Sequence, residues 1–196
     1  MQGFAVEDSG RLRVLREAAG EQDGLGLVRA VLGVAGAFGS AKGSALGGPI
    51  ALVSSFGAES AVLLDMVATV DPTTPVIFLD TGRLFPETLE HRQELCAHLG
   101  LTDVRHVRPD AAALRRYDPE GELARTEPDL CCHLRKTEPL EQALDGFAAW
   151  ITGRKRFQGG ARGDLELLEA EPGTGRVKIN PLAHWSLEDV RHYRRL

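Results

Sequence analysis

The sequence predicts an α/β fold in which a mostly parallel, twisted sheet carries helices on both faces. A short apolar run with β-branched residues at 50–53 has the composition of a buried strand, and further strands are expected at 76–79 and 104–107. Helical stretches at 58–70 and 86–100 separate them. Strands that alternate with helices at this pace pair in parallel, so a ligand is expected at the carboxyl ends of the strands.

The residues before the first strand form a separate segment in this prediction. Two amphipathic or buried helices are expected at 6–19 and 25–38, followed by a small-residue linker at 38–48 that we expect to be mobile. We therefore divide the chain into N-terminal helices with a linker, 1–48, and a single α/β core domain, 49–196.

The second half of the chain predicts two more helices and two more strands: helices at 131–136 and 138–148, and strands at 149–152 and 177–180. A last helix begins with a capping box formed by Ser186 and Asp189. Because no stop signal such as Gly, Asn or Pro appears before Leu196, we expect the core to be truncated within that helix.

The composition excludes several classes of protein. The 196 residues are 43% hydrophobic and 26% charged, with a net charge of -5, which is typical of a soluble domain without a global basic excess for nucleic acid. No apolar run reaches the ~18 residues that cross a membrane, and the N-terminus lacks the features of a signal peptide. We expect a cytoplasmic protein that binds neither nucleic acid nor membrane. Its basic residues gather in the second half, which favours a pocket for a small polyanion.

A turn of small polar residues follows the first strand and contains Ser54, Ser55, Gly57 and Ser60. A helix N-terminus has free backbone N–H groups and partial positive charge, so hydroxyl donors and a glycine there favour an anion, most often phosphate. The turn matches neither GxxxxGK[ST] nor GxGxxG, and similar turns occur in α/β proteins that bind no phosphate. Both interpretations stay open on the turn alone.

The chain has three cysteines, and Cys131 and Cys132 are adjacent. Adjacent cysteines are strained disulfide partners, and an odd total argues against a disulfide framework. Two thiolates on one helical turn can instead hold one edge of an iron–sulfur cluster, with Arg135 and Lys136 offsetting its charge, although a [4Fe–4S] cluster usually needs four cysteines. Cys96 shares a helix face with apolar residues and is interpreted as a core side chain. On its own, the pair is also compatible with coincidence.

Five motifs in order resemble the assimilatory sulfonucleotide reductases: SSFGAES, FLDTGRLFPET, CCHLRKTEPL, WITGRKRFQ and INPLAHWSLEDV. The double cysteine resembles the iron–sulfur branch, the adenylyl-sulfate (APS) reductases, and differs from the cluster-free phosphoadenylyl-sulfate (PAPS) branch. The resemblance implies an adenine nucleotide alpha-hydrolase-like fold, a [4Fe–4S] cluster, and thioredoxin-dependent reduction of APS to sulfite and AMP in sulfate assimilation and cysteine biosynthesis.

The resemblance also implies a substrate site at the carboxyl ends of the strands. The modified phosphate loop would comprise Ser54, Ser55, Phe56, Gly57 and Ser60, and the segment along the adenosine would comprise Leu79, Asp80, Thr81 and Gly82. The residues near the ribose and phosphosulfate would be Gly153, Arg154, Lys155, Arg156 and Arg162. Lys136 would bridge the substrate and the cluster, which Cys131 and Cys132 would ligate. Guanidinium groups suit a sulfate anhydride because they offer paired donors, although a basic loop can also be simply solvated.

In the family, a cysteine thiolate near the C-terminus attacks the sulfur of APS, AMP leaves, and thioredoxin or glutaredoxin then releases sulfite from the enzyme. This chain has neither that cysteine nor the CxxC pair that completes the cluster, so no catalytic residue is assigned. Either it is the front part of a longer protein, which we favour, or it is a short relative that binds nucleotide without reducing it. We expect no sulfite formation by this chain alone, and we expect a homo-oligomer.

Three other functions compete with APS reduction. The first is PAPS reduction, which is the same chemistry on a 3′-phosphorylated substrate. The second is a nucleotide-binding or regulatory module without a reaction of its own. The third is a pyrophosphatase-type adenylating enzyme, but the SGGxDS loop of those proteins differs from SSFGAES.

Overall fold

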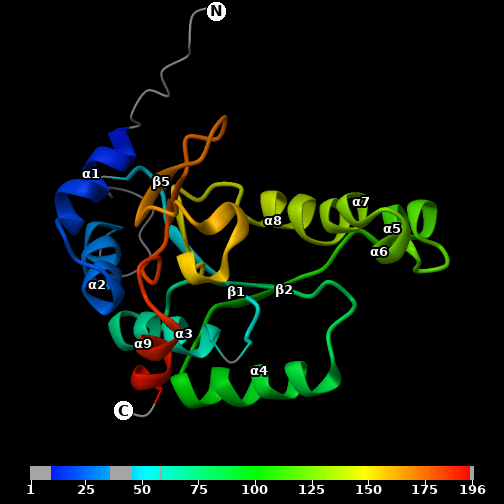
Figure 1. Cartoon of the computed structure of the whole chain (residues 1–196), viewed down its shortest axis with the longest axis horizontal. Coiled ribbons are helices and arrows are strands. Elements are labelled where there is room, and N and C mark those ends of the chain that lie inside the picture. Colours follow the sequence, from blue (N-terminus) through cyan, green and yellow to red (C-terminus); the bar gives the residue numbers. More distant parts are fainter. Residues whose placement is uncertain (1–9, 36–45, 58, 195–196) are drawn as a thin grey trace, which may run out of the picture.

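A six-stranded sheet organises the protein, with the strand order β3-β2-β1-β4-β6-β5 (Figure 1). The strands are β1 Ile50–Ser54, β2 Val76–Leu79, β3 Val104–Val107, β4 Ala149–Thr152, β5 Leu168–Ala170 and β6 Val177–Ile179. All neighbours pair in parallel except β5, which runs antiparallel to β6 at one edge. The computed structural model describes residues 10–35, 46–57 and 59–194, and within them the mostly parallel sheet is confirmed.

Helices cover both faces of this sheet, as predicted. One face packs against α1 Gly10–Ala19, α2 Gly24–Ala35, α3 Ser60–Val70, α4 Pro86–Leu99 and α9 Leu187–Tyr193. The other face packs against α8 Glu138–Ala143. Each face of the sheet therefore has its own hydrophobic core, and the core on the face with α1 to α4 and α9 is the larger. Successive side chains of β1 point to opposite faces, so Leu52 lies in the larger core and Ala51 in the smaller one.

The N-terminal helices are part of the larger core. Leu15 of α1 and Leu27 of α2 are fully buried with Leu52 of the sheet. Both helices were expected to be longer, but residues 6–9 and 36–38 lie outside the described residues, as does most of the linker predicted at 38–48. Leu46 is buried, and its carbonyl accepts a hydrogen bond from Arg11 Nε at 2.8 Å. This contact joins the end of the linker to α1.

The stretch of chain that connects β3 to β4 forms an arm that projects from the sheet (Figure 1). We use this name for residues 110–137, which form α5 Ala111–Tyr117, α6 Leu123–Thr126, α7 Pro128–Cys132 and the π-helix η1 His133–Thr137. The predicted helix at 131–136 therefore has two geometries, and its second half is wound more widely than an α-helix. The helix predicted at 138–148 ends at Ala143, because the chain turns through Gly146, whose φ is +80°.

Local signals at other helix ends are confirmed. Pro86 begins α4 and Gly100 ends it in the left-handed conformation. Ser186 and Asp189 form the reciprocal capping box at the start of α9. Among the described residues, no helix has the length and apolar character needed to span a bilayer.

Candidate functional site

A cleft of about 520 Å³ lies where β1 and β4 end side by side. We call it the main cleft. Its lining comes from the end of β1 and the turn after it, and from the end of β4 and the loop after that: Val53, Ser55, Gly57, Glu59, Ser60, Thr152, Gly153, Arg154, Lys155, Gln158 and Arg162. Seven of these eleven were predicted from the sequence, so the fold gathers most of the serine turn and most of the basic loop around one opening.

The serine turn is held from beneath by Phe56. Its backbone has a φ of +54°, in the region that non-glycine residues rarely adopt, and its N–H donates to Ser54 Oγ at 3.1 Å. Its ring is buried edge-on against Phe78, with 5.3 Å between the ring centroids. Phe56 and Ser54 thus anchor the turn from inside, while Ser55 lines the cleft.

Two hydroxyl groups meet at the mouth of this turn. Ser55 Oγ lies 3.3 Å from Ser60 Oγ. Ser60 is the first residue of α3, and the side chain of the N-cap residue Glu59 makes no capping hydrogen bond. The Ser60 N–H donates to the Gly57 carbonyl at 2.8 Å, so the donors that Ser55 and Ser60 present here are their two hydroxyls.

The opposite wall contains a lysine that the protein itself engages. Lys155 is only 2% exposed, and its Nζ donates to Glu59 Oε2 at 3.0 Å and to the Gly153 carbonyl at 2.9 Å. Glu59 also accepts from Gln158 Nε2 at 3.3 Å, and Gln158 accepts from Arg162 Nη1. This chain of contacts ties the basic loop to the serine turn. Glu59 and Gln158 were not predicted as site residues. Glu59 is 96 positions from Lys155 and 99 from Gln158 in the sequence, and no local pattern indicates that such distant residues pair.

Arg154 and Arg156 point to different surroundings. Arg154 lines the main cleft, and its Nη1 lies 3.9 Å from Glu169 Oε2. Arg156 is not part of the lining, because its Nε donates to the Leu165 carbonyl at 2.7 Å and its Nη2 lies 3.3 Å from Glu166. The three consecutive basic residues therefore separate into a cleft arginine, a buried lysine and an arginine that closes its own loop.

The predicted LDTG segment lies at the end of β2, next to β1 in the sheet. Leu79 is the last residue of β2, and Asp80 follows it almost fully buried. Asp80 accepts hydrogen bonds from the Gly82 N–H at 2.9 Å and Arg108 Nε at 3.0 Å, and its Oδ2 lies 2.8 Å from His106 Nε2. Burial raises the pKa of this carboxyl, but these partners together hold it below its ordinary value.

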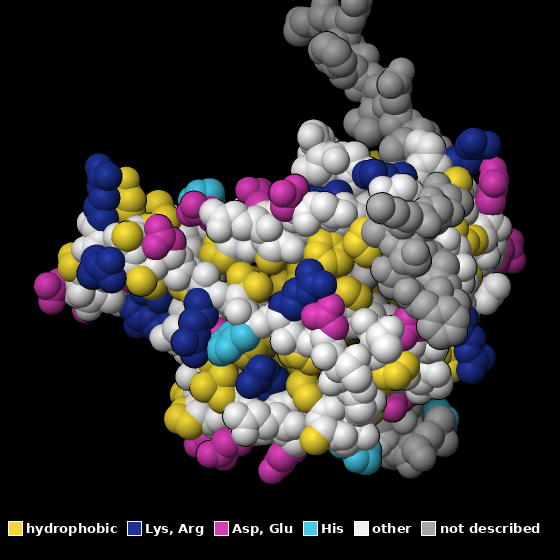
Figure 2. Space-filling model, turned by 180° about the vertical axis from the view of Figure 1, so that it is seen from behind, with side chains coloured by type: hydrophobic (Ala, Val, Ile, Leu, Met, Phe, Trp, Pro, Cys, Tyr) yellow, Lys and Arg dark blue, Asp and Glu magenta, His cyan; other side chains and the backbone are white. Residues whose placement is uncertain are grey.

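A second hollow, of about 250 Å³, contains both adjacent cysteines, and we call it the cysteine pocket. Its lining joins the arm to the end of β2: Thr81, Arg83, Ala124, Pro128, Cys131, Cys132, Arg135 and Lys136. Predicted residues Thr81 and Lys136 thus lie with the cysteines, and the pocket shares no lining residue with the main cleft. Figure 2 shows Lys, Arg and His side chains interspersed with hydrophobic ones on the face seen from behind, where the arm meets the body.

A buried ion pair supports the cysteine pocket. Arg135 Nη2 donates to Asp118 Oδ2 at 2.6 Å, and Arg135 Nη1 donates to the Thr81 carbonyl at 2.9 Å. The hydrogen bond from Arg135 is the main reason that the pKa of Asp118 lies below its ordinary value. Arg135 therefore links the π-helix to the end of α5 within the arm and to the end of β2 in the body.

The cysteine pocket supplies part of the donor set for an iron–sulfur cluster. Cys131 is half-buried and Cys132 is exposed, and basic side chains line the same hollow. The remaining cysteine, Cys96, packs with Leu89 and Leu99 against the core, and burial raises the pKa of its thiol. No group of three potential metal ligands occurs among the residues that the structure describes. The donors present fit two of the four positions of a [4Fe–4S] cluster and do not complete one.

Comparison with known proteins gives consistent results. The profile of the phosphoadenosine phosphosulfate reductase domain matches residues 49–196. An adenosine 5'-phosphosulfate reductase from Mesorhizobium japonicum is 53% identical over 146 residues, covering 74% of this chain and 57% of the relative. One from Chelativorans sp. is 48% identical, with 76% and 60% covered, and a phosphoadenosine 5'-phosphosulfate reductase from Gloeobacter violaceus is 38% identical, with 75% and 61% covered.

A solved structure shares the fold. The phosphoadenylyl-sulfate reductase from Candida auris, determined as a phosphate complex, superposes with a TM-score of 0.62 at 27% sequence identity, covering 74% of this chain and 71% of that one. The chain spans only 57% to 61% of the length of the three curated relatives. The family profile nevertheless covers most of it, and we conclude that this protein belongs to the phosphoadenosine phosphosulfate reductase domain family.

Proposed function

We propose that the main cleft binds adenylyl sulfate and that the complete protein reduces it to sulfite and AMP in sulfate assimilation. The carrying observation is that serine hydroxyls on one wall face Arg154 and Arg162 on the other. This opening lies beside β1, where the strand order turns toward β2 on one side and β4 on the other. A sheet of this kind binds its ligand at that switch point.

Each wall has a role in this proposal. Ser55, Gly57 and Ser60 offer hydroxyl and backbone donors to the anionic group, and Arg154 and Arg162 offer guanidinium donors from the opposite side. Lys155 holds the cleft in shape through Glu59. The end of β2, from Leu79 to Gly82, lies along the adenosine.

The chemistry requires a thiolate that this chain does not supply. A cysteine thiolate elsewhere in the complete protein attacks the sulfur of APS, the sulfur–oxygen bond to the phosphate breaks, and AMP departs with that electron pair. One thiol of thioredoxin or glutaredoxin then attacks the cysteine Sγ of the resulting S-sulfocysteine. Sulfite leaves, and a mixed disulfide forms between the donor and the enzyme. The second thiol of the donor closes its disulfide and returns the enzyme cysteine as a thiol, which balances a two-electron reduction.

We also propose that Cys131 and Cys132 supply two ligands of a [4Fe–4S] cluster, whose other two come from outside these residues. Bound there, the cluster would supply concentrated charge, and Lys136, which lines the cysteine pocket, would offset it. We place the complete enzyme in the cytoplasm as a homo-oligomer.

The relatives support APS over PAPS, because the two APS reductases are 53% and 48% identical and the PAPS reductase is 38% identical. PAPS reduction is the alternative, since relatives with that name match the same region.

Calorimetric titration of the purified chain with AMP, APS and PAPS tests this proposal. We expect APS to bind more tightly than PAPS, and Arg162→Ala to weaken APS binding about tenfold, as expected for a lost charged hydrogen bond. Arg125→Ala, which removes an exposed arginine on the arm, is the matched control and is expected to bind like the unmodified chain. Absence of nucleotide binding, or equal effects of the two variants, would refute the assignment of the main cleft.

A further inference from the structure

The three cations that line the main cleft differ in how firmly the protein holds them. Lys155 is buried and donates to a carboxylate and a carbonyl, and Arg162 donates to Gln158. Arg154 is 30% exposed at its side chain, and its partner among the described residues, Glu169, is 3.9 Å away. That separation is an ion pair rather than a hydrogen bond, so the donors of Arg154 stay available to a ligand.

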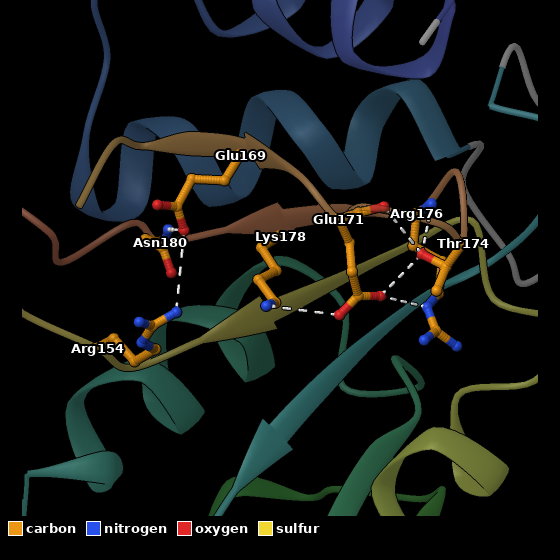
Figure 3. Close-up of polar contacts among 7 residues, drawn as sticks. All are labelled: Arg154, Glu169, Glu171, Thr174, Arg176, Lys178 and Asn180. Carbon is orange, nitrogen blue, oxygen red and sulfur yellow. Dashed lines mark hydrogen bonds and ion pairs between the residues drawn. The ribbon is translucent and has the colours of Figure 1, made fainter. Parts of the chain in front are cut away.

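Glu169, by contrast, is held firmly. It lies on β5, the antiparallel edge strand, and its Oε2 accepts a hydrogen bond from Asn180 Nδ2 at 2.9 Å. Asn180 is fully buried and also donates to the Glu166 carbonyl at 2.7 Å. Figure 3 shows Asn180 and Glu169 side by side, with Arg154 extending toward the same carboxylate. A buried amide therefore fixes the carboxylate that faces the cleft arginine.

We propose that Glu169 is a positioning residue that keeps Arg154 oriented for the anion of the nucleotide, an inference that rests on the proposed function of the main cleft. An arginine side chain has many rotamers, and binding a ligand requires it to adopt one. A fixed carboxylate behind the guanidinium restricts that choice before the ligand arrives. The donors not directed at Glu169 then face the cleft.

Glu169 could also affect anion affinity through its charge alone, and that effect would have the opposite sign to the effect of positioning. If Glu169 acted only through its charge, it would reduce the positive potential of the cleft, and its removal would tighten anion binding. If it acts by positioning, its removal weakens binding. The direction of the change in affinity therefore separates the two.

The decisive comparison is between Glu169→Gln and Glu171→Gln. Both remove one negative charge from the same segment, but Glu171 contacts Arg176 and Lys178 rather than Arg154 (Figure 3). Titration calorimetry with AMP and APS is expected to show about two- to fivefold weaker binding for Glu169→Gln, the range for a partly exposed ion pair, and unchanged binding for Glu171→Gln. Unchanged or tighter binding by Glu169→Gln, or equal weakening by both variants, overturns the proposal.

A double-mutant cycle tests whether Glu169 acts through Arg154. In an Arg154→Ala background, Glu169→Gln is expected to have no further effect on AMP affinity, because the residue that it positions is gone. Additive effects of the two substitutions would contradict the proposal. Thermal unfolding of every variant separates a loss of affinity from a loss of folded protein.

A ligand-free measurement keeps this inference distinct from the proposed function. The Nε–H resonance of Arg154 in NMR spectra reports the order of its side chain without any nucleotide. We expect Glu169→Gln to make this group more mobile and Glu171→Gln to leave it unchanged. If the chain binds no nucleotide but this difference in mobility is observed, the proposed function fails and the positioning of Arg154 stands. If nucleotide binds but Arg154 is equally mobile in the two variants, only the positioning fails.

Discussion

The main cleft and the cysteine pocket are built in different ways. The main cleft lies directly on the sheet, where neighbouring strands β1 and β4 end together. The cysteine pocket lies at the junction of the sheet with the arm, which extends away from the body (Figure 1). The first therefore takes its shape from the paired strands, and the second depends on how the arm is attached.

The contacts that support the two sites reflect this difference. In the main cleft, apolar packing fixes the serine turn, because the ring of Phe56 is 1% exposed. In the cysteine pocket, the support is polar, through the contacts of Arg135 with Asp118 and the Thr81 carbonyl. Packing of a ring tolerates pH and salt, whereas a site held by charges responds to both. We therefore expect the serine turn to be less sensitive to pH and salt than the cysteine pocket, whereas the Lys155–Glu59 pair that joins the basic loop to the turn responds to both.

The largest expected effect on stability is that of Phe56→Ala. Removing a buried ring leaves a cavity beside Phe78, and such substitutions cost about 3–5 kcal/mol of unfolding free energy. Denaturant unfolding measures the loss, and AMP affinity should fall with it because the serine turn loses its anchor. Phe85→Ala is the matched control, since Phe85 is 75% exposed and its removal should change stability by less than about 0.5 kcal/mol. Similar losses for the two variants would contradict this account of the turn.

Arg135→Met is expected to have the next largest effect and to act on the other region. It removes the partner of a buried carboxylate and the link to Thr81, so the arm should loosen while the main cleft is retained. Thermal unfolding should show a smaller decrease than for Phe56→Ala, and Cys131 and Cys132 should be alkylated faster by iodoacetamide. Cys96, which packs against the larger core, should react as before.

Arg83→Met is the control for this prediction. Arg83 also approaches Asp118, at 3.6 Å, and its Nη2 donates to the Gly121 carbonyl, but its side chain is 46% exposed. An exposed pair contributes little, so both the unfolding temperature and the alkylation rates should change less. If Arg83→Met and Arg135→Met behave alike, the buried contacts of Arg135 are not what holds the arm in place.

The difference between a site placed by paired strands and a site held by distant contacts also explains which features could be predicted from the sequence. Apolar periodicity and β-branched composition predicted β2, β3 and β4 with the bounds that the structure has. Residues next to a strand end are positioned by that strand, so Ser55 and Arg154 could be expected at the edge of the sheet and are found lining one cleft there. These predictions succeed because they depend on local pattern and on the general topology of parallel sheets.

Features that depend on distant partners were missed. β5 was not predicted, since Leu168–Ala170 is a short segment whose strand character depends on pairing with β6. Neither α5 nor α6 was predicted. The arm that they form is closed by the contact of Arg135 with Asp118, 17 residues apart, and joined to the end of β2 by the contact of Arg135 with the Thr81 carbonyl, 54 residues apart. The positive φ of Gly146 also ended a helix that periodicity alone extended. Local sequence does not encode which charged residue meets which.

The smallest expected effect concerns Asp80, which lies between the two regions at the end of β2. Hydrogen bonds from Gly82, His106 and Arg108 outweigh burial and hold its pKa below the ordinary value of 3.8. A carboxyl whose pKa is lower in the folded than in the unfolded protein stabilises the fold fully above the unfolded value. That contribution is lost as the pH falls through the folded value. Asp80 should therefore contribute at neutral pH and cease to contribute only in acid.

Asp80→Asn tests this difference through the pH dependence of unfolding. Asparagine does not ionise, so the variant should be less stable than the unmodified chain at pH 7, and the gap should close as the pH falls below about 4. Denaturant unfolding across that range gives the two curves, and their difference isolates Asp80 from the other carboxylates that titrate in acid. A gap that stays constant down to pH 2 would mean that Asp80 stabilises the end of β2 by shape and neutral hydrogen bonds, as the serine turn is stabilised. It would not then act by charge, as Arg135 and Asp118 do at the cysteine pocket.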